Sequence, residues 1–534
     1  MAKQSSAQTE IELKLRGDPE ALLRLWQAQP LNPSGQAAAK VKNLENVYYD
    51  TADLRLRRRG LAFRIRRDGA RFIQTVKAGD DTAATVFSRR EWERDVPSLE
   101  PQVDGIDDPH IRAALGLILP GELRPVFTTR VRREVREVNG ADSLGRLKLI
   151  EAAFDRGEIE AAGRREPLAE IELELLQGPP RALFDLALAL QDTAPTQIET
   201  RSKSARGYAL ATGRRATWHR AAAMKLSGKM GIDDALAAIL DSCLRHWSAN
   251  ELAALNGSDS EGVHQLRIGL RRFHSALATF GPLLPPGQLA WLRAEAKWIL
   301  GCLGPARDWN VFQTELLAPL EANRPDDPDF AVLRRAAQDH QAVAYSQVRE
   351  ALSAPRYTRF LLQFGGWLAD RGWRSAELTG RQKTALDRPL LKLATAQLNK
   401  RHRQVSKLGK GFKKLSVAER HELRIAVKKL RYTTEFFRGL YPAKRAKPYL
   451  AALRGLQESL GHLNDVAVAE HLLAELTSGV ELGKTAAQHQ RAAGKVIGWY
   501  DRALLDFEPE LRHTWKAFAA SAPFWKKASR KTAP

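Results

Sequence analysis

The sequence predicts an α+β protein of several domains, with an antiparallel β-sheet in its N-terminal part and only helices after it. Three observations predict this. The chain has 534 residues, too many for one ordinary hydrophobic core. Apolar residues alternate with polar ones from Glu10 to about Arg206 and recur with helical spacing after about residue 228. The expected regions are a sheet domain at 1–212, a linker at 213–228, a helical domain at 229–520 and a basic tail at 521–534.

Strand patterns fill most of the N-terminal part. They read NVYYDT, LAFRIRR, RFIQTVKAG, SRREWERDV, LKLIEAAFDRGEI and AEIELELL. Turn signals such as Arg67-Asp68-Gly69 separate them, and helical spacing interrupts them at 19–29 and 180–191. This number of strands predicts an antiparallel sheet large enough to curl or close.

Composition and charge narrow the classes of function. Cys243 and Cys302 have no metal-ligand spacing, and the polar start MAKQSSAQTE lacks the apolar core of a signal peptide, so we expect a cytoplasmic protein. Charges interrupt every apolar run, so we expect no membrane span. The formal net charge of +22 predicts an anionic partner: nucleic acid, an acidic membrane surface or a condensed phosphate polymer.

Charged side chains occupy one face of several predicted strands. In EIELKL, alternation places Glu10, Glu12 and Lys14 on one face and aliphatic residues on the other. EIELEL repeats the pattern with three glutamates. Similar faces carry Arg64 and Arg66; Arg89, Glu91 and Glu93; Lys77; and Arg130 or Arg133. For any single strand, a solvated face is the simpler interpretation.

Several such strands in one closed sheet favour a different interpretation. If the charged faces point inward, the sheet encloses clustered acids surrounded by arginine and lysine, an arrangement that is costly unless a ligand supplies the missing charges. Mg²⁺ or Mn²⁺ suits the carboxylates, and phosphoryl oxygens suit the guanidinium and ammonium groups. The predicted ligand is therefore a compact polyphosphate with a divalent metal.

The ordered motifs resemble the CYTH superfamily, the triphosphate tunnel metalloenzymes. EIELKL is similar to the ExExK signature of that family, and YYDT, FRIR, TVK, RREWE, FTTRVRR, AFDRGEI, EIELEL and SKSARGY follow in the expected order over residues 9–212. The resemblance implies an eight-stranded antiparallel tunnel that binds a triphosphate with Mg²⁺ or Mn²⁺.

The resemblance also implies roles for individual residues. The implied metal ligands are Glu10, Glu12, Glu170 and Glu172. The implied phosphate ligands are Lys14, Arg64, Arg66, Lys77, Arg89, Arg133 and Lys203, and Glu10, Glu12 and Lys14 form the implied catalytic set. Asp155 is expected to orient one of the phosphate ligands. Whether Glu174 is a ligand stays open, because it shares the parity of Glu170 and Glu172 but its depth between the interior and the tunnel mouth is not fixed by alternation. The direction of Arg130 stays open as well, because strand parity cannot place both Arg130 and Arg133 inside.

The helical part contains an internal repeat. VHQLRIGLRRFHSAL begins at Val263 and RHELRIAVKKLRYTTE begins at Arg420. His264, Arg267, Arg271 and Arg272 correspond to His421, Arg424, Lys428 and Lys429, at offsets that stack on one helical face. Asp308 and Asp465 each follow their histidine by 44 residues, which supports a duplication.

The repeated helices are strongly basic. From Arg401 to Arg431 there are eleven Lys and Arg against two acidic residues, Glu419 and Glu422. A solvated helical face is the structural alternative, but exposed faces commonly place acids at i+4, and these lack them. Metal binding by the histidines is a weaker alternative, since neither copy has a second His or Cys on the same face.

This part resembles the CHAD domain, an α-helical module of two related bundles associated with inorganic polyphosphate. The implied groove residues are His264, Arg267, Arg271, Arg272, Arg307, His421, Arg424, Lys428, Lys429, Arg431 and Tyr432, with Asp308 and Asp465 bracing them. Nucleic acid is not expected, because the basic helices offer few aromatics for base stacking.

The sequence therefore predicts metal-dependent hydrolysis of inorganic triphosphate, with polyphosphate bound by the helical domain. Two alternatives remain: a non-catalytic protein bound to polyphosphate granules, and a CYTH-type adenylate cyclase. The expected location is the cytoplasm, with polyphosphate granules as a possible site of association. The sequence leaves chain-length preference, metal preference, oligomeric state and exchange of substrate between domains open.

Overall fold

The computed structural model describes residues 8–32, 39–79, 87–118, 121–257, 259–375, 377–478 and 484–526. Two compact units make up the chain. The first contains Met1–His219, Ser248–Asn256 and Leu352–Gly372, and the second contains Arg220–Trp247, Gly257–Ala351 and Trp373–Pro534. The domain limits predicted from the sequence stay a prediction, and residues 527–534 of the expected tail lie outside the described residues.

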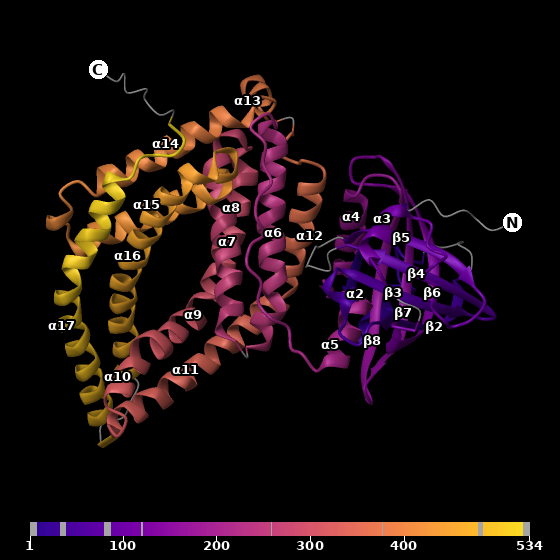
Figure 1. The fold of residues 1–534 in the computed structure, drawn as a ribbon, viewed down its shortest axis with the longest axis horizontal. Helices are drawn as coiled ribbons and strands as arrows, with labels where there is room; N and C mark the ends of the chain where they lie inside the picture. Colours follow the sequence, from indigo (N-terminus) through magenta and orange to yellow (C-terminus); the bar gives the residue numbers. More distant parts are fainter. Residues whose placement is uncertain are drawn as a thin grey trace. The chain divides into compact units, whose positions relative to one another are not determined.

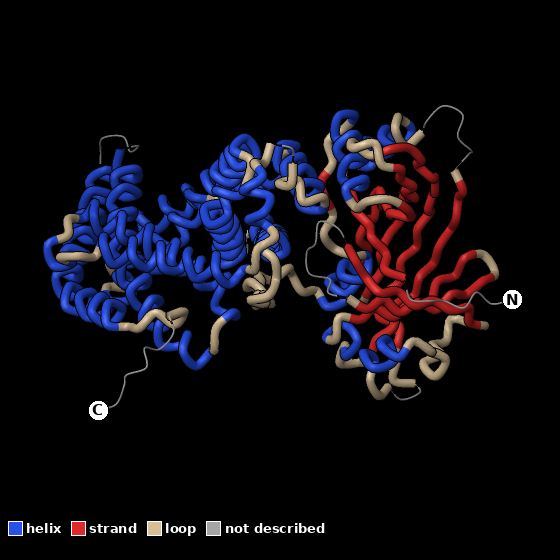
Figure 2. The backbone as a smooth tube through the Cα atoms, turned by 90° about the horizontal axis from the view of Figure 1, so that it is seen from above, coloured by secondary structure: helices blue, strands red, loops and turns tan. Residues whose placement is uncertain are grey.

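The first unit is built on an antiparallel sheet, whose strands are red in Figure 2. The strands are β1 (Gln8–Arg16), β2 (Lys40–Asp50), β3 (Leu61–Asp68), β4 (Arg71–Ala78), β5 (Phe87–Val96), β6 (Arg124–Ala141), β7 (Leu147–Ala161), β8 (Arg164–Gln177) and the short β9 (Gln197–Ile198). Their order is β5-β4-β3-β2-β6-β7-β8-β1-β9, and a further pairing of β1 with β5 closes the ring of the eight long strands. The predicted antiparallel sheet is confirmed.

Helices cover the aliphatic outer faces of this sheet. Leu13 and Leu15 on β1 are fully buried, and β1 and β8 contact α4 (Arg181–Thr193). Helix α1 (Pro19–Gln27) also packs on β8 and places Trp26 against Phe154, with ring centroids 5.9 Å apart. Asp18 caps α1 by accepting hydrogen bonds from two backbone N–H groups, which fixes where the helix begins. The outward burial of these apolar residues turns the charged faces inward.

A second group of helices covers β2 to β5. Phe63, Val76 and Trp92 from the outer faces of these strands pack with Ile111 and Leu115 of α3 (Pro109–Leu115). The short α2 (Arg55–Arg58) adds a fully buried leucine to the same cluster. Apolar burial of this kind is the main favourable term in folding, so these helices hold the sheet closed from outside.

Helix α5 (Lys203–Thr212) closes one end of the tunnel. Apolar residues on the inner sides of the strands pack there against Tyr208: Tyr48, Phe127, Val131, Ile159 and Leu168. Gly207 lies so close to this cluster that an added Cβ would stand 2.1 Å from the ring of Phe127. The close approach sets the depth at which α5 directs its first turn into the tunnel.

The rest of the described chain is helical, which confirms the predicted fold class (Figure 1). The helices are α6 (Ile232–Asn256), α7 (Ser260–Phe280), α8 (Pro286–Cys302), α9 (Gly304–Val311), α10 (Ala318–Asn323), α11 (Pro328–Ser353), α12 (Pro355–Ala369), α13 (Gly380–Leu386), α14 (Leu390–Leu408), α15 (Val417–Phe437), α16 (Ala443–Ser478) and α17 (Lys484–Ala520). Short helical turns are η1 (Gly281–Leu283), η2 (Phe312–Leu317), η3 (Phe412–Lys414) and η4 (Arg438–Leu440). Among the described residues, none of these helices is long and apolar enough to cross a membrane.

The repeated motifs lie on α7 and α15, which contact each other in the second unit. Helix α9 packs on both α7 and α16, so the segments that follow the two motifs are also brought together. Helix α12 belongs to the first unit and packs on α4, where Gly365 accommodates the ring of Phe184. The internal repeat therefore corresponds to two neighbouring helices in space.

Candidate functional site

Charged side chains from seven strands and α5 line the interior of the tunnel. They are Glu10, Glu12, Lys14, Arg64, Arg66, Lys77, Glu91, Glu93, Arg133, Glu151, Asp155, Glu170, Glu172, Glu174 and Lys203. Every sequence-predicted tunnel residue with a described side chain is among them. The backbone of Arg89 pairs opposite Glu10, but its side chain lies outside the described residues.

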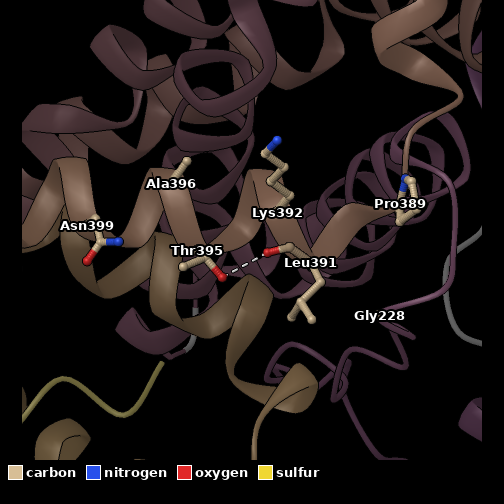
Figure 3. A pocket seen from close by; sticks show the side chains of 7 residues that line it. All are labelled: Gly228, Pro389, Leu391, Lys392, Thr395, Ala396 and Asn399. Atoms are coloured by element: carbon tan, nitrogen blue, oxygen red, sulfur yellow. Dashed lines mark hydrogen bonds between the residues drawn. The ribbon is translucent and has the colours of Figure 1, made fainter. Parts of the chain in front are cut away.

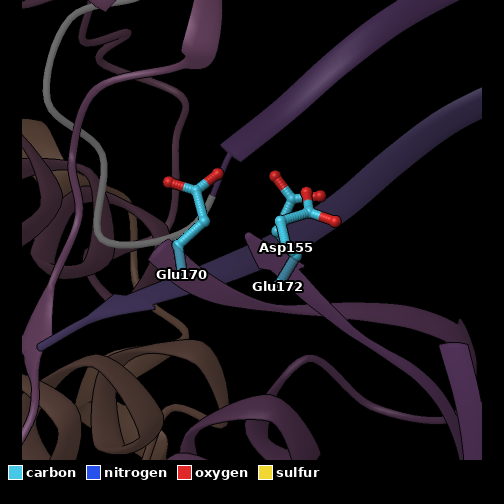
Figure 4. A group of neighbouring side chains, drawn as sticks. All are labelled: Asp155, Glu170 and Glu172. Atoms are coloured by element: carbon cyan, nitrogen blue, oxygen red, sulfur yellow. The ribbon is translucent and has the colours of Figure 1, made fainter. Parts of the chain in front are cut away.

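Three buried carboxylates form the deepest part of the site. Asp155, Glu170 and Glu172 each offer an oxygen, and these oxygens lie within 4.8 Å of one another. Figure 4 shows the carboxylates of Asp155 and Glu172 close together, with Glu170 beside them. Asp155 and Glu170 are fully buried and Glu172 is 7% exposed. Such a set of hard oxygen donors has the chemistry of a divalent-metal site.

Cations already surround this acidic triad. The Nζ of Lys203 lies 2.7 Å from Asp155, 2.5 Å from Glu170 and 2.8 Å from Glu172. Arg133 donates to Asp155 over 2.8 Å and also contacts Glu172, and the Nζ of Lys14 lies 2.5 Å from Glu172. Arg206 lies 3.4 Å from Glu170, so four cations meet three carboxylates and the triad has little uncompensated charge.

The ionisation of the triad follows from these contacts. Burial raises the pKa of Glu172, but Lys14 and Lys203 outweigh it and hold the pKa well below its usual value. Burial likewise opposes the charge of Lys203, but Asp155 and Glu170 outweigh it and raise the pKa of that lysine. Burial raises the pKa of Glu170 despite the nearby lysine. The lysines hence stay protonated in the tunnel at neutral pH.

A second group of carboxylates has fewer cationic partners. Glu174 stands opposite Glu12 in the register of β1 and β8, and opposite Glu151 in that of β7 and β8. Burial, then the charges of Glu10 and Glu151, raise the pKa of Glu174 to about 8. Lys77 is the cation closest to this group, 2.7 Å from Glu10. This part of the tunnel has more carboxyl groups than cations, and at neutral pH Glu174 is mostly protonated.

The two residues whose placement the sequence left open are resolved by these contacts. Glu174 faces inward, because it interacts with Glu10 and Glu12. Arg130 faces outward, where its side chain is 51% exposed and pairs with Glu45 and Glu160. Arg133, three positions later, is therefore on the inner side, as alternation requires.

Arginines from β3 form a cationic wall opposite the acids. The Nη2 of Arg64 lies 3.4 Å from Glu91, whereas its buried Nε has no hydrogen-bond partner. The charge of Arg64, followed by burial, lowers the pKa of Arg66 to about 10. Arg66 donates from Nε to Asn46 over 3.2 Å. Neighbouring guanidinium groups that repel each other and have a spare N–H donor are suited to phosphoryl oxygens.

Some interior residues were missing from the predicted site. Glu91 and Glu93 showed the right alternation in the sequence, and Glu151 shares the parity of Asp155 on β7, so alternation could have identified all three. Arg206 on α5 donates to Glu166 over 2.8 Å and also approaches Glu170. Its only sequence signal was its position three residues after Lys203, the spacing of one helical face.

The second unit contains a basic cluster made by both copies of the repeat. We define it as His264, Arg267 and Arg271 on α7, Arg307 and Asp308 on α9, Arg424, Lys428, Arg431 and Tyr432 on α15, and Asp465 on α16. Corresponding positions of the repeat, such as Arg267 and Arg424, both belong to it. The Nε atoms of Arg267, Arg271 and Arg424 are buried and have no hydrogen-bond partner.

Mutual repulsion in the basic cluster is strong. Burial, with help from Arg424 and Arg271, lowers the pKa of Lys428 to about 7. Burial, together with Arg307 and Arg271, lowers the pKa of His264 to about 3. Burial raises the pKa of Asp308 and Asp465 in spite of the arginines beside them, which fits their expected bracing position. A bound anion would relieve this repulsion.

Two of the predicted groove residues have their described contacts outside the basic cluster, and a third is exposed. Arg272 is buried in the helical core, where it donates to Ser242 over 3.1 Å and lies 5.8 Å from the ring of Phe436, so its prediction as a groove residue is wrong. The charge of Lys429, the counterpart of Arg272 in the second copy, helps to lower the pKa of His274, which is not part of the basic cluster. Both follow a cluster residue directly, and one position turns a side chain by about 100° around the helix. His421 is exposed, unlike the half-buried His264.

Comparisons with known proteins identify similar domains. Residues 8–208 match the profile of the CYTH domain, and residues 238–474 match that of the CHAD domain. The chain is 30% identical to an inorganic triphosphatase from Haemophilus influenzae over 214 residues, which are 38% of this chain and 54% of that protein. The chain thus spans about half the length of this curated relative.

Solved structures show likenesses to each part. The CHAD domain from the plant Ricinus communis is 31% identical, covering 56% of this chain and 97% of that one, with a TM-score of 0.49. A Hippeastrum protein described as revealing a dominant triphosphatase activity is 22% identical, covering 38% of this chain and 96% of that one, with a TM-score of 0.30.

Proposed function

Because this chain consists of an N-terminal CYTH domain and a C-terminal CHAD domain, we propose that it hydrolyses inorganic triphosphate in the tunnel and binds inorganic polyphosphate through its helical domain. One observation supports hydrolysis in the tunnel: the same enclosed interior holds a group of carboxyls around Glu174 and two arginines with spare capacity for an anion. The buried Nε of Arg64 has no hydrogen-bond partner, and the guanidinium of Arg66 is repelled by that of Arg64. A triphosphate with a divalent metal supplies both missing charges.

The donor set fits Mg²⁺ or Mn²⁺, which prefer hard carboxylate oxygens. We propose Glu10 and Glu12 on β1, with Glu170 and Glu172 on β8, as the residues that hold it. Glu174 is a further candidate, because the cations around the deep triad leave most of the surplus carboxyl groups near Glu174. When bound, the metal supplies Lewis-acid charge for the phosphoryl oxygens and the attacking water.

The chain's own cations would bind and orient the substrate. Arg64 and Arg66 present forked donors that can each match two phosphoryl oxygens. Arg133, whose Nε and Nη2 donate to Asp155, and Arg89 are further predicted ligands. Lys14, Lys77 and Lys203 carry pKa values raised by neighbouring carboxylates, whose charges outweigh the effect of burial, so they enter the reaction protonated. Fixed positive charge at the transferring phosphoryl group stabilises the transition state without a nucleophilic side chain.

Phosphate release tests this proposal. Purified protein is incubated with triphosphate, ATP or thiamine triphosphate, with Mg²⁺, Mn²⁺ or EDTA, and phosphate and cyclic AMP are measured. We expect phosphate from triphosphate only with metal, and loss of this activity in Glu10→Gln and Glu12→Gln. Glu160→Gln, on the outer side of the sheet, is the matched control. A metal-independent Glu10→Gln enzyme contradicts the proposal.

A non-catalytic binding protein is the second candidate. The deep triad is already paired with Lys14, Arg133 and Lys203, so the tunnel is electrostatically stable without turnover. Binding of triphosphate without released phosphate would favour this candidate, and cyclic AMP from ATP would favour a cyclase.

The basic cluster supports the second half of the proposal. Its buried Nε donors on Arg267, Arg271 and Arg424 have no partner in the structure, and an unpaired buried donor is costly unless a ligand meets it. Polyphosphate offers closely spaced acceptors without bases. We expect Arg267→Gln combined with Arg424→Gln to lose polyphosphate binding, whereas Arg245→Gln, from an exposed pair with Asp241, should retain it.

A further inference from the structure

The exposed face of α14 carries a row of cations that the functions above do not use. Lys392, Lys400, Arg403 and Lys407 are all exposed. Helical rotation of 100° per residue places them within an arc of about 80°, along about 22 Å of the helix. We call these four residues the α14 ridge. The opposite face of α14 is buried and packs on α15, so the ridge points away from the basic cluster's helix.

The α14 ridge has no acidic partners. Residues 388–418 contain no Asp or Glu at all, and none of the four ridge cations forms an ion pair in the described part of the chain. Elsewhere on the helical surface, exposed arginines do pair at i,i+4, as Arg245 does with Asp241 and Arg512 with Glu508. The absence of such pairs leaves a continuous positive face. Lys410, Lys413 and Lys414 extend it beyond the helix, all exposed.

A shallow groove lies beside the first residue of the ridge. It has a volume of about 620 Å³ and is lined by Leu391, Lys392, Ala396 and their neighbours. Figure 3 shows the Lys392 side chain extending from the helix, while the hydroxyl of Thr395 donates back to the carbonyl of Leu391 over 2.9 Å. The groove therefore has few polar groups that could recognise a ligand, so the positive charges are the main binding groups on this face.

We propose that the α14 ridge is a second polyanion-binding surface, which takes the part of a long inorganic polyphosphate chain that extends beyond the basic cluster. This inference rests on the proposed polyphosphate binding. A straight row of four cations matches a linear chain with a negative charge on every unit. The ridge gives long chains additional electrostatic contacts that short chains cannot reach.

The side chains around the ridge favour polyphosphate over other polyanions. Phe412 is buried and stacked on Trp515, with ring centroids 5.2 Å apart, so it is not available to a base. Between residues 390 and 414, all of which are described, Leu391 is the only large apolar side chain that is exposed. A membrane-binding helix needs an apolar face to insert, and α14 does not provide one.

The test compares two variants that each lose four charges. The ridge variant is K392Q/K400Q/R403Q/K407Q. The control is R335Q/R349Q/R381Q/K383Q, whose residues are exposed on α11 and α13 and form no ion pair among the described residues. Affinity for chains of about ten and about one hundred phosphates is measured by fluorescence anisotropy at several salt concentrations, with single-stranded DNA of matched charge as a competitor.

We expect the ridge variant to bind long chains at least about tenfold more weakly at low salt, and short chains as well as wild type does. The slope of log K against log salt for long chains should fall by about 3, because each lost contact accounts for about 0.7 to 0.9. Equal behaviour of the ridge and control variants overturns the inference, as does tighter binding of DNA that depends on the ridge. If the wild-type protein binds no polyphosphate, the proposed function itself is refuted. That result can be told apart from the two results that overturn only the inference about the α14 ridge.

Discussion

Glu12 on β1 stands directly opposite Glu174 on β8, so two carboxylates face each other across one strand pair inside the tunnel. Burial, followed by the charges of Glu10, Glu151 and Glu12, raises the pKa of Glu174 to about 8, and no cation lies within hydrogen-bonding distance of it in the described structure. Ionising Glu174 at neutral pH therefore costs free energy in the folded protein, and a bound divalent cation would reduce that cost.

Replacing Glu174 should remove this cost. We expect Glu174→Gln to raise the midpoint of thermal unfolding without metal and to reduce the further stabilisation that Mg²⁺ gives the wild type. Calorimetry with Mg²⁺ or EDTA measures both. Glu160→Gln on the outer side should change neither. An undiminished Mg²⁺ effect in Glu174→Gln would mean that this carboxylate is remote from the metal.

Lys203 should contribute strongly to the stability of the first unit. Its ammonium contacts Asp155, Glu170 and Glu172, so Lys203→Met leaves buried carboxylates without their shared cation. Removing one partner of a buried ion network costs about 3 to 5 kcal/mol. Urea denaturation should show this loss, against less than about 1 kcal/mol for Arg245→Met, which breaks an exposed pair. A loss as small as the control's would show that the network is not needed for stability.

Gly207 should control the position of α5. A Cβ there would meet the ring of Phe127 at 2.1 Å, so Gly207→Ala should displace the helix, cost about 1 to 3 kcal/mol and weaken triphosphate binding by moving Lys203. In the helix α17, a Cβ on Gly494 meets nothing within 4 Å, so Gly494→Ala should stabilise the protein by about 0.5 to 1 kcal/mol. Urea denaturation measures the free energy of unfolding of both variants. A decrease for Gly207→Ala and an increase for Gly494→Ala would support the close approach of Gly207 to Phe127.

Lys428 should make polyphosphate binding depend on pH. Burial, together with Arg424, Arg271 and Arg267 from α15 and α7, outweighs the charge of Asp465 from α16 and lowers the pKa of Lys428 to about 7. Above that pH, Lys428 is mostly neutral in the free protein. A bound anion can pair with an ammonium group there only if Lys428 takes up a proton on binding. Affinity should therefore fall by up to tenfold per pH unit as the pH rises through 7.

The variant Lys428→Arg keeps its charge at all these pH values and should flatten the profile. Binding isotherms from about pH 6 to 9 measure both proteins. The sign for stability is opposite: a lysine with a lowered pKa destabilises the fold at low pH, so stability should rise as the pH increases from about 7 towards 10.5, the usual value. Identical pH profiles for the two proteins would exclude Lys428 from the bound state.

Alternation and repetition made much of this protein predictable. Period-two patterns indicated the strands, and parity placed Glu10, Glu12 and Lys14 on a common face. Parity also required that Arg130 and Arg133 point to opposite sides, but it could not say which one faces inward. The contacts of Arg130 with Glu45 and Glu160 settled that question.

Helical spacing was a less certain guide to the basic cluster. Offsets grouped Arg271 with Arg272, yet the structure buries Arg272 against Ser242 while Arg271 stays with the other cations. Adjacent residues on a helix diverge by about 100°, and only the packing of α7 decides which direction is core. The same limit explains why Lys429 is apart from Lys428.

The sequence by itself determined the two kinds of secondary structure, the charged face of each strand and the duplication of the basic helix, because these depend on residue order and local geometry. Tertiary structure decided the depth and partners of each charge. Sheet closure through β1 and β5 and the insertion of α5 bring Lys203 to Asp155, Glu170 and Glu172, and leave Glu174 among other acids. The strength of an electrostatic interaction depends on the distance between the charges and on their burial, and the alternation of residues along a strand predicts neither.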